Sequence, residues 1–286
     1  MPVSGVDEST PRFLQIGDAE FALIDSSPAE THEPPCLMIH GFTGHRDDFI
    51  GVVPRLSRER RVIVPDLRGH GDSVDKAGIC GWSFDQLMKD VIGLLDALEI
   101  ERCDLLGHSM GGMLTLRLAL AQPERFRSLI FMCTAPELPQ KLSREGFEIG
   151  SDIADARGME GLQVLMEKAA RRDCSPTIAG WGERYWSHHR RRLCAMTPES
   201  FRGVGTAFFD SESLVDRLPE IEAPTLILVG ESDADFLPGA DLFEKTLPHV
   251  KRVTLAGAEH HPHQENTSAW FAAVETHLAA VGRPTQ

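Results

Sequence analysis

The chain has 286 residues, of which 42% are hydrophobic and 25% charged, and its formal net charge is −14. This composition is typical of a globular protein with one large domain, or a domain that carries an insertion. The acidic charge argues against nucleic acid or an anionic membrane surface as the main partner. No segment approaches the ~20 apolar residues of a membrane helix, and residues 1–10 lack the basic and apolar runs of a signal peptide. A cytoplasmic protein without membrane insertion is therefore expected.

The six cysteines form no C-x-x-C pair. Cys36, Cys103 and Cys133 lie in short apolar runs, which is typical of reduced, buried thiols. Neither a disulfide framework nor a zinc site is expected.

Short apolar runs alternate with helical patterns in the first half of the chain. The clearest helix is expected over 83–98, where Ser83 and Gln86 have the spacing of a capping box and leucines recur on one face. The other helices expected here are 48–56 and 110–121. The expected strands are 13–16, 21–24, 36–39, 62–64, 103–106 and 129–132.

The alternation stops at Pro136 and returns after Pro224. The segment between holds helical patterns without a buried strand, at 147–153, 159–172 and 198–207. Beyond it we expect strands 225–229 and 252–255 and helices 239–246 and 268–280. The pattern predicts an α/β fold with a mostly parallel sheet, helices on both faces and an inserted helical cap. The division is a core over 1–135, a cap over 136–220 and the rest of the core over 221–286. The cap should cover the sheet's carboxyl edge, where open α/β sheets bind ligands.

A G-x-S-x-G motif, residues 107–111, lies between the strand 103–106 and the helix 110–121. Such a turn strains the central residue and presents its hydroxyl at a helix N-terminus, where negative charge is favoured. The setting predicts Ser109 as a nucleophile; the alternative is an ordinary glycine-rich turn.

A serine nucleophile needs a base, a carboxylate to orient the base, and donors for the oxyanion. Three candidate bases, His260, His261 and His263, follow the strand 252–255. Their ordinary role would be solvated loop residues, and no cysteine or acidic residue at ligand spacing supports a metal site at the latter two. The loop after strand 225–229 offers Asp233, which we favour as the acid, with Asp235 and then Glu231 as rivals.

Two backbone N–H groups are the expected oxyanion donors. One belongs to Met110, which follows the nucleophile, and the other to Phe42 in the loop His40-Gly41-Phe42-Thr43-Gly44 after strand 36–39. The alternative for this loop is a plain glycine turn.

These residues resemble the α/β-hydrolase family. The order Ser109, Asp233, His260 is the family's order of nucleophile, acid and histidine, and His40-Gly41-Phe42 is similar to its H-G-x loop. Residues 65–73 resemble its D-x-R-G-x-G-x-S segment. Residues 260–265 resemble its G-H-x-x-x-x-E tail, with Glu259 in place of the glycine, and this favours His260 as the base.

The resemblance covers 12–135 and 221–281. It implies a triad without metal, nucleotide or redox cofactor. A serine at position 109 argues against an epoxide hydrolase or a dehalogenase, whose nucleophile is an aspartate.

The cap is expected to decide specificity. Trp181, Tyr185 and Trp186 are candidate substrate-binding residues, although aromatic side chains of this kind are also typical of a core. Residues 164–202 hold eight Lys and Arg against four Asp and Glu, a local charge of +4 that includes Arg190-Arg191-Arg192. Such a run is either solvated surface or an entrance that attracts carboxylated substrates.

The function favoured by these features is hydrolysis of a small-molecule carboxylic ester through an acyl-enzyme. The alternatives on the same triad are a carbon–carbon bond hydrolase or a lactonase. A ligand receptor that keeps a hydrolase scaffold and a non-hydrolytic lyase are further alternatives.

Overall fold

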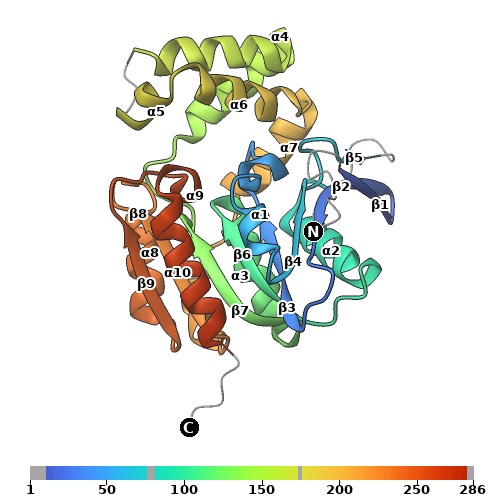
Figure 1. Cartoon of the computed structure of the whole chain (residues 1–286). Coiled ribbons are helices and arrows are strands. Elements are labelled where there is room, and N and C mark those ends of the chain that lie inside the picture. The colour runs from blue at the N-terminus through green and yellow to red at the C-terminus, as the bar shows by residue number, and fades with distance from the viewer. Residues whose placement is uncertain (1–10, 76–80, 173–175, 282–286) are drawn as a thin grey trace.

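The computed structural model describes residues 11–75, 81–172 and 176–281. A twisted sheet stands between two groups of helices, and a further layer of helices lies above one edge of the sheet (Figure 1). The strands are β1 (Arg12–Ile16), β2 (Ala19–Ser26), β3 (Glu33–Ile39), β4 (Arg60–Pro65), β5 (Val74–Asp75), β6 (Cys103–His108), β7 (Phe126–Met132), β8 (Thr225–Gly230) and β9 (Val250–Leu255).

The strand order is β1-β2-β4-β3-β6-β7-β8-β9, with β5 paired to β2. The strands β4, β3, β6, β7, β8 and β9 pair in parallel, whereas β1, β2 and β5 join antiparallel. The predicted α/β fold with a mostly parallel sheet is confirmed. Because parallel strands end at one edge, the loops after β3, β6, β8 and β9 gather on the same side of the molecule.

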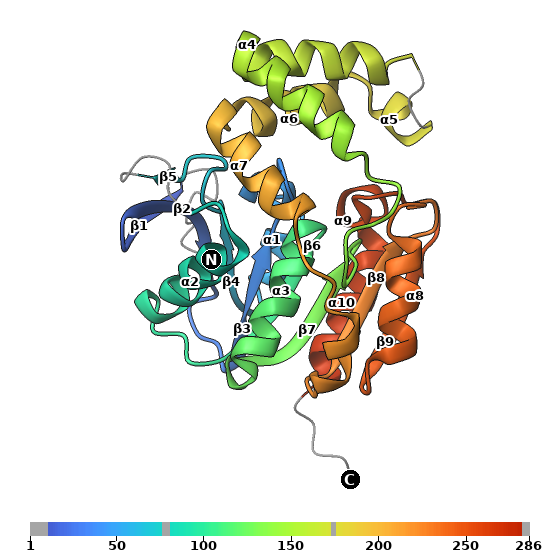
Figure 2. The same ribbon diagram turned by 180° about the vertical axis from the view of Figure 1, so that it is seen from behind.

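Helices cover both faces of the sheet (Figures 1 and 2). Side chains of α1 (Val53–Leu56) and α10 (Thr267–Ala280) are buried against one face, where Trp270 is fully enclosed. Side chains of α2 (Phe84–Ala97), α3 (Met110–Ala121) and α8 (Leu237–Thr246) are buried against the other. The short helices are η1 (Arg46–Phe49), η2 (Pro123–Arg125), η3 (Val215–Glu220) and α9 (Pro262–Glu265).

Four helices form the layer above the sheet edge, which we call the helical layer (Figure 1). They are α4 (Arg144–Ala170), α5 (Pro176–Trp181), α6 (Glu183–Cys194) and α7 (Pro198–Phe209). The layer has a small apolar core of its own, in which Leu162, Leu193 and Phe201 pack together. The division into 1–135, 136–220 and 221–286 stays a prediction.

The helical layer differs in detail from the sequence-based expectation. The helices expected at 147–153 and 159–172 are parts of α4, which Gly158 interrupts with φ 72° and ψ 172°. The helices α5 and α6 were not expected. Two of the four buried residues of α6 are His189 and Arg192, so the apolar spacing that marks a helix is missing there.

Two further expectations hold only in part. Ser83 accepts a hydrogen bond from the Gln86 N–H (3.2 Å), but the Gln86 side chain donates to Asp90 (2.9 Å), so the capping box is half formed. The helix expected over 48–56 is divided into η1 and α1.

Among the described residues, Cys36, Cys103, Cys133 and Cys194 are free thiols, and the first three are buried, as predicted. Cys80 and Cys174 lie outside the described residues. Within the same ranges, no helix is long and apolar enough to cross a membrane.

Candidate active site

Ser109 lies at the sharp turn between β6 and α3, with φ 54° and ψ −122°. The turn is closely packed: a methyl group at Gly107 would lie 2.3 Å from Gly111 O, and one at Gly111 would lie 2.4 Å from His40 O. The Ser109 carbonyl accepts a hydrogen bond from Thr134 Oγ1 (2.6 Å). The two glycines therefore let the chain hold a serine backbone conformation that is otherwise unfavourable.

His260 and Asp233 are brought together at the same edge. His260 Nδ1 lies 2.9 Å from Asp233 Oδ2, and the imidazole ring stacks on Phe236 with 4.7 Å between the ring centroids. A carboxylate accepts, so Nδ1–H donates and Nε2 is left as a proton acceptor. Ser109 and His260 line one cavity. The predicted nucleophile, base and acid therefore lie on one cavity, and their catalytic roles stay predictions.

His261 and His263 make other contacts. Arg192 Nη1 donates to His261 Nε2 (3.1 Å), and burial together with this guanidinium lowers the pKa of His261 well below its usual range. Burial lowers the pKa of His263 to about 4, and its ring stacks on Phe49 at 5.0 Å. Neither imidazole bonds to Asp233 among the contacts of the described residues.

His108, the first of the two variable residues of the G-x-S-x-G motif, makes a contact that the sequence did not predict. Its Nε2–H donates to the carbonyl of His260 (2.8 Å). Burial and the neighbouring imidazoles hold the pKa of His108 well below its usual range, so the ring is neutral. This hydrogen bond joins the serine turn to the loop that carries His260. The sequence gives no signal for this contact, because a histidine next to a serine does not by itself indicate a hydrogen bond to a distant loop.

Among the described residues, two groups of side chains have the spacing of metal ligands. The ligand atoms of Cys133, Asp233 and His260 lie within 4.8 Å of one another. However, Asp233 and His260 bond to each other, and burial holds the pKa of Cys133 well above its usual range, so the thiol stays protonated. The second group, His45, Asp66 and Asp72, carries carboxylates that Arg46 already neutralises.

The expected oxyanion loop lies against Ser109. A methyl group at Gly41 would lie 2.9 Å from Ser109 Cβ, and Gly44 N–H donates to Gly41 O (3.0 Å). His40 fixes the position of the loop. Its Nδ1–H donates to Gly41 O (2.8 Å), and its Nε2 accepts from Leu67 N–H (3.0 Å). Burial lowers the pKa of His40 to about 4, consistent with this neutral tautomer. Met110, the other expected donor, is the first residue of α3, where helix N–H groups lack intrahelical partners.

The segment 65–73 contacts the oxyanion loop through the Leu67 N–H, and other hydrogen bonds hold the segment itself in place. Asp66 accepts hydrogen bonds from Arg46 N–H (2.7 Å) and Asp72 N–H (2.9 Å). Arg68 forms two hydrogen bonds to Asp90, at 2.7 and 2.8 Å. The contacts indicate a structural role for this motif.

A cavity of about 390 Å³ opens beside Ser109, and we call it the serine cavity. Its apolar lining comes from Phe42, Leu142, Ile178, Phe208 and Phe236. Its polar lining comes from Ser109, Tyr185, His260, His261 and the carboxylates Asp233, Asp235, Glu259 and Glu265.

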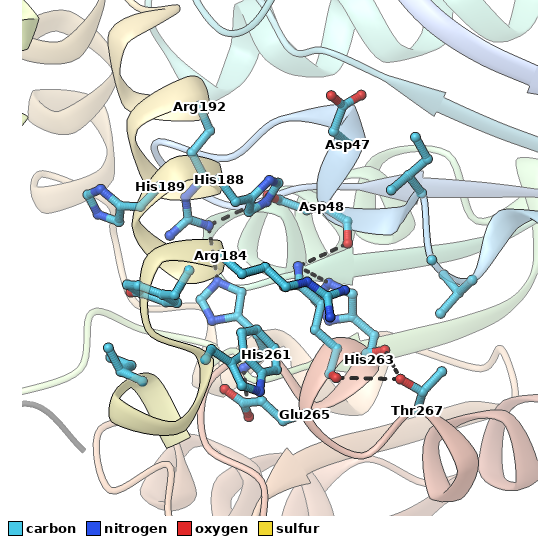
Figure 3. Close-up of a pocket in the computed structure, with 17 residues that line it drawn as sticks. Asp47, Asp48, Arg184, His188, His189, Arg192, His261, His263, Glu265 and Thr267 are labelled. Carbon is cyan, nitrogen blue, oxygen red and sulfur yellow. Dashed lines mark hydrogen bonds and ion pairs between the residues drawn. The ribbon is translucent and has the colours of Figure 1, made fainter. Parts of the chain in front are cut away.

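A second cavity of about 390 Å³ is lined by side chains of α6, among them Arg184, His188 and Arg192, and we call it the arginine cavity (Figure 3). Tyr185 and His261 line both cavities, whereas Trp181 lines only the second. Trp186 lines neither: it is 3% exposed, and its ring packs on Tyr185. Of the three expected substrate-binding aromatics, Tyr185 alone borders the serine cavity.

The arginine run ties the helical layer to the core. Arg190 pairs with Glu167 within the layer (2.9 Å), whereas Arg191 reaches Asp47 of η1 (2.7 Å). Arg192 Nη1 lies 3.7 Å from Asp48 Oδ1. Because each of the three arginines has a carboxylate partner, the contacts do not favour an open entrance for anions.

Asp48 is where several of these contacts between the helical layer and the core meet. His188 Nε2 lies 2.7 Å from its Oδ1, and Oδ2 accepts from the His45 N–H (3.0 Å) next to the oxyanion loop. The Gln264 side chain donates to the Asp48 carbonyl (3.0 Å). Burial acts in the opposite direction, yet Arg192 and His188 hold the pKa of Asp48 well below its usual range. Asp48 thus joins the residue after the oxyanion loop to α6 and α9.

The comparisons with known proteins agree with this architecture. Residues 34–267 match the family model described as the alpha/beta hydrolase fold. The chain therefore belongs to the α/β-hydrolase family.

Its relatives differ in chemistry. The chain is 26% identical over 257 residues to a pimeloyl-[acyl-carrier protein] methyl ester esterase of Aeromonas hydrophila (85% of this chain, 94% of that one). It is 29% identical over 251 residues to a 2-hydroxy-6-oxononadienedioate/2-hydroxy-6-oxononatrienedioate hydrolase of Cupriavidus pinatubonensis (81% and 82%). The structure superposes with a TM-score of 0.81 and 25% identity on a thermophilic esterase from Thermogutta terrifontis (96% and 100%).

Asp48→Asn is expected to lower the free energy of unfolding by about 3–5 kcal/mol, because it leaves the buried Arg192 without its counter-charge. Asp210→Asn is the matched control, since Asp210 pairs with Arg144 and the two side chains are 59% and 44% exposed. Such an exposed pair contributes about 0–1 kcal/mol. Urea unfolding of both variants measures the difference, and equal losses would contradict the buried role of Asp48.

Proposed function

We propose that the protein is a carboxylic-ester hydrolase that acts through an acyl-enzyme. The observation that carries this proposal is the hydrogen bond between His260 and Asp233 (2.9 Å) beside the strained Ser109, with all three residues on one cavity. The family membership and the esterases among the relatives support it.

In the proposed reaction, Ser109 Oγ attacks the ester carbonyl while its proton passes to His260 Nε2. Asp233 holds the imidazole tautomer and stabilises the imidazolium. The N–H groups of Phe42 and Met110 donate to the oxyanion, and each such donor contributes about 3 kcal/mol. The C–O bond then breaks, and the alcohol leaves with the proton from His260. His260 then takes a proton from water while the water oxygen attacks the acyl carbon. The bond between the acyl carbon and Ser109 Oγ breaks, Oγ recovers the proton from His260, and the acid leaves.

The same residues would also serve a carbon–carbon bond hydrolase or a lactonase, and a relative named as a dienedioate hydrolase keeps the first of these open. A receptor on a hydrolase scaffold would bind a ligand without turnover. In our proposal the helical layer acts as a cap over the serine cavity, and Tyr185 contacts the substrate. The protein is proposed to be cytoplasmic, without nucleic acid as a partner.

Ser109→Ala is expected to lower kcat for p-nitrophenyl esters by about 10⁴-fold or more without unfolding the protein. The nucleophile is lost, whereas the packing of the turn is kept. Stopped turnover and lost labelling by an organophosphate fluorophore are the measurements, with circular dichroism as the control for folding. Labelling that persists in the variant would exclude Ser109 as the nucleophile.

Among the three neighbouring histidines, only His260→Ala is expected to abolish turnover. His261→Ala and His263→Ala should retain more activity, because their imidazoles bond elsewhere. If His261→Ala or His263→Ala were inactive while His260→Ala kept its activity, the assignment of His260 as the base would be wrong.

Asp233→Asn is expected to lower kcat by about 10²–10⁴-fold with little change in KM, because orientation and charge act mainly in the transition state. Asp235→Asn should cost far less, since the carboxylate bonded to His260 is that of Asp233. Steady-state kinetics on one ester compares the two variants. The opposite ranking in kcat would move the acid to Asp235.

A further inference from the structure

The ionisable lining of the serine cavity is strongly one-sided. Its described residues include four carboxylates and two histidines, but no lysine or arginine. A substrate that enters the cavity therefore meets negative charge next to Ser109.

Two of the four carboxylates are already engaged. Asp233 bonds to His260, and Glu265 accepts hydrogen bonds from the N–H groups of Glu259 (2.5 Å) and His261 (3.3 Å). The other two, Asp235 and Glu259, make no ion pair with any residue in the described ranges and are partly buried.

Three cations line neighbouring cavities but not the serine cavity, and one of them is the exposed Arg184 of the arginine cavity. Arg192 lines the arginine cavity behind His261, and its guanidinium faces Asp48 at 3.7 Å. Lys141 donates to the Ala234 carbonyl (3.3 Å) and lines a separate surface pocket with Asp235, but the two described residues form no ion pair.

The remaining lining offers apolar contact. Phe42, Leu142, Ile178, Phe208 and Phe236 surround the space that an acyl or alkyl group would fill. Hydrocarbon is stabilised there by burial, whereas a carboxylate would lose its water and face two like charges.

We propose that the substrate is an ester whose acyl part is apolar and uncharged, and that Asp235 and Glu259 reject acyl groups carrying a carboxylate. This inference rests on the proposed ester hydrolysis. It separates the chain from the Cupriavidus pinatubonensis relative, which is named for hydrolysis of a dioate, a molecule with two carboxylates.

The test uses two p-nitrophenyl esters of the same shape. The 6-methylheptanoate ends in an isopropyl group, and the hydrogen adipate ends in a carboxylate at the same place. With spontaneous hydrolysis subtracted, wild-type kcat/KM for the adipate is expected to be at least about tenfold lower, a factor that corresponds to about 1.4 kcal/mol. Added salt should narrow the ratio, because it screens the repulsion.

The variant Asp235→Asn/Glu259→Gln should reduce this ratio about fivefold or more. The matched control is Glu148→Gln/Glu160→Gln, which removes two exposed carboxylates of α4 and changes the net charge equally. The control should keep the wild-type ratio, since its charges do not line the cavity. Because each ratio is measured on one enzyme preparation, a partial loss of folding cancels.

The outcomes separate the two proposals. Absence of ester turnover in the wild type would reject the proposed function itself. Turnover of both esters at equal kcat/KM, or a ratio insensitive to salt and to the cavity variant, would overturn the inference alone. If the double variant is inactive, the single variants and the wild-type salt dependence decide.

Discussion

The backbone of Ser109 holds φ 54° because three neighbouring segments pack against it without room for further side-chain atoms. Gly107 meets Gly111, Gly111 meets the carbonyl of His40, and Gly41 meets Ser109 itself. A backbone in this region is strained by about 1–3 kcal/mol, and only the surrounding structure keeps it there. The position of the hydroxyl is thus set by the crossing of β3, β6 and α3.

Buried neutral histidines extend this constraint to the other loops. His40 fixes the carbonyl of Gly41, and His108 fixes the carbonyl of His260. Both rings are kept uncharged by burial, so each has one donor and one acceptor and a defined orientation. The loops that bring Phe42 and His260 to the cavity are therefore held by side chains that take no part in the proposed chemistry.

The sequence predicted the mostly parallel sheet, because the short apolar strands have strong local signals. The catalytic roles given to residues at its carboxyl edge stay predictions. The neighbouring Asp233 and His260 followed from strand ends and from the family resemblance. The helix α6 was missed because its buried face contains His189 and Arg192, which are polar. The roles of His108 and Asp48 were also missed, since both depend on contacts between residues far apart in the chain.

The attachment of α6 to Asp48 has a consequence for how this fold diversifies. The Asp48 carboxylate bonds to His188 and lies beside Arg192 of α6. It also accepts a hydrogen bond from the His45 N–H, so one side chain holds both the helical layer and the residue that follows the oxyanion loop. A helical layer taken from another member of the family would not carry Asp48, because this residue belongs to the core. Exchange of the helical layer between family members would therefore transfer substrate specificity only if residues 45–48 were exchanged together with it.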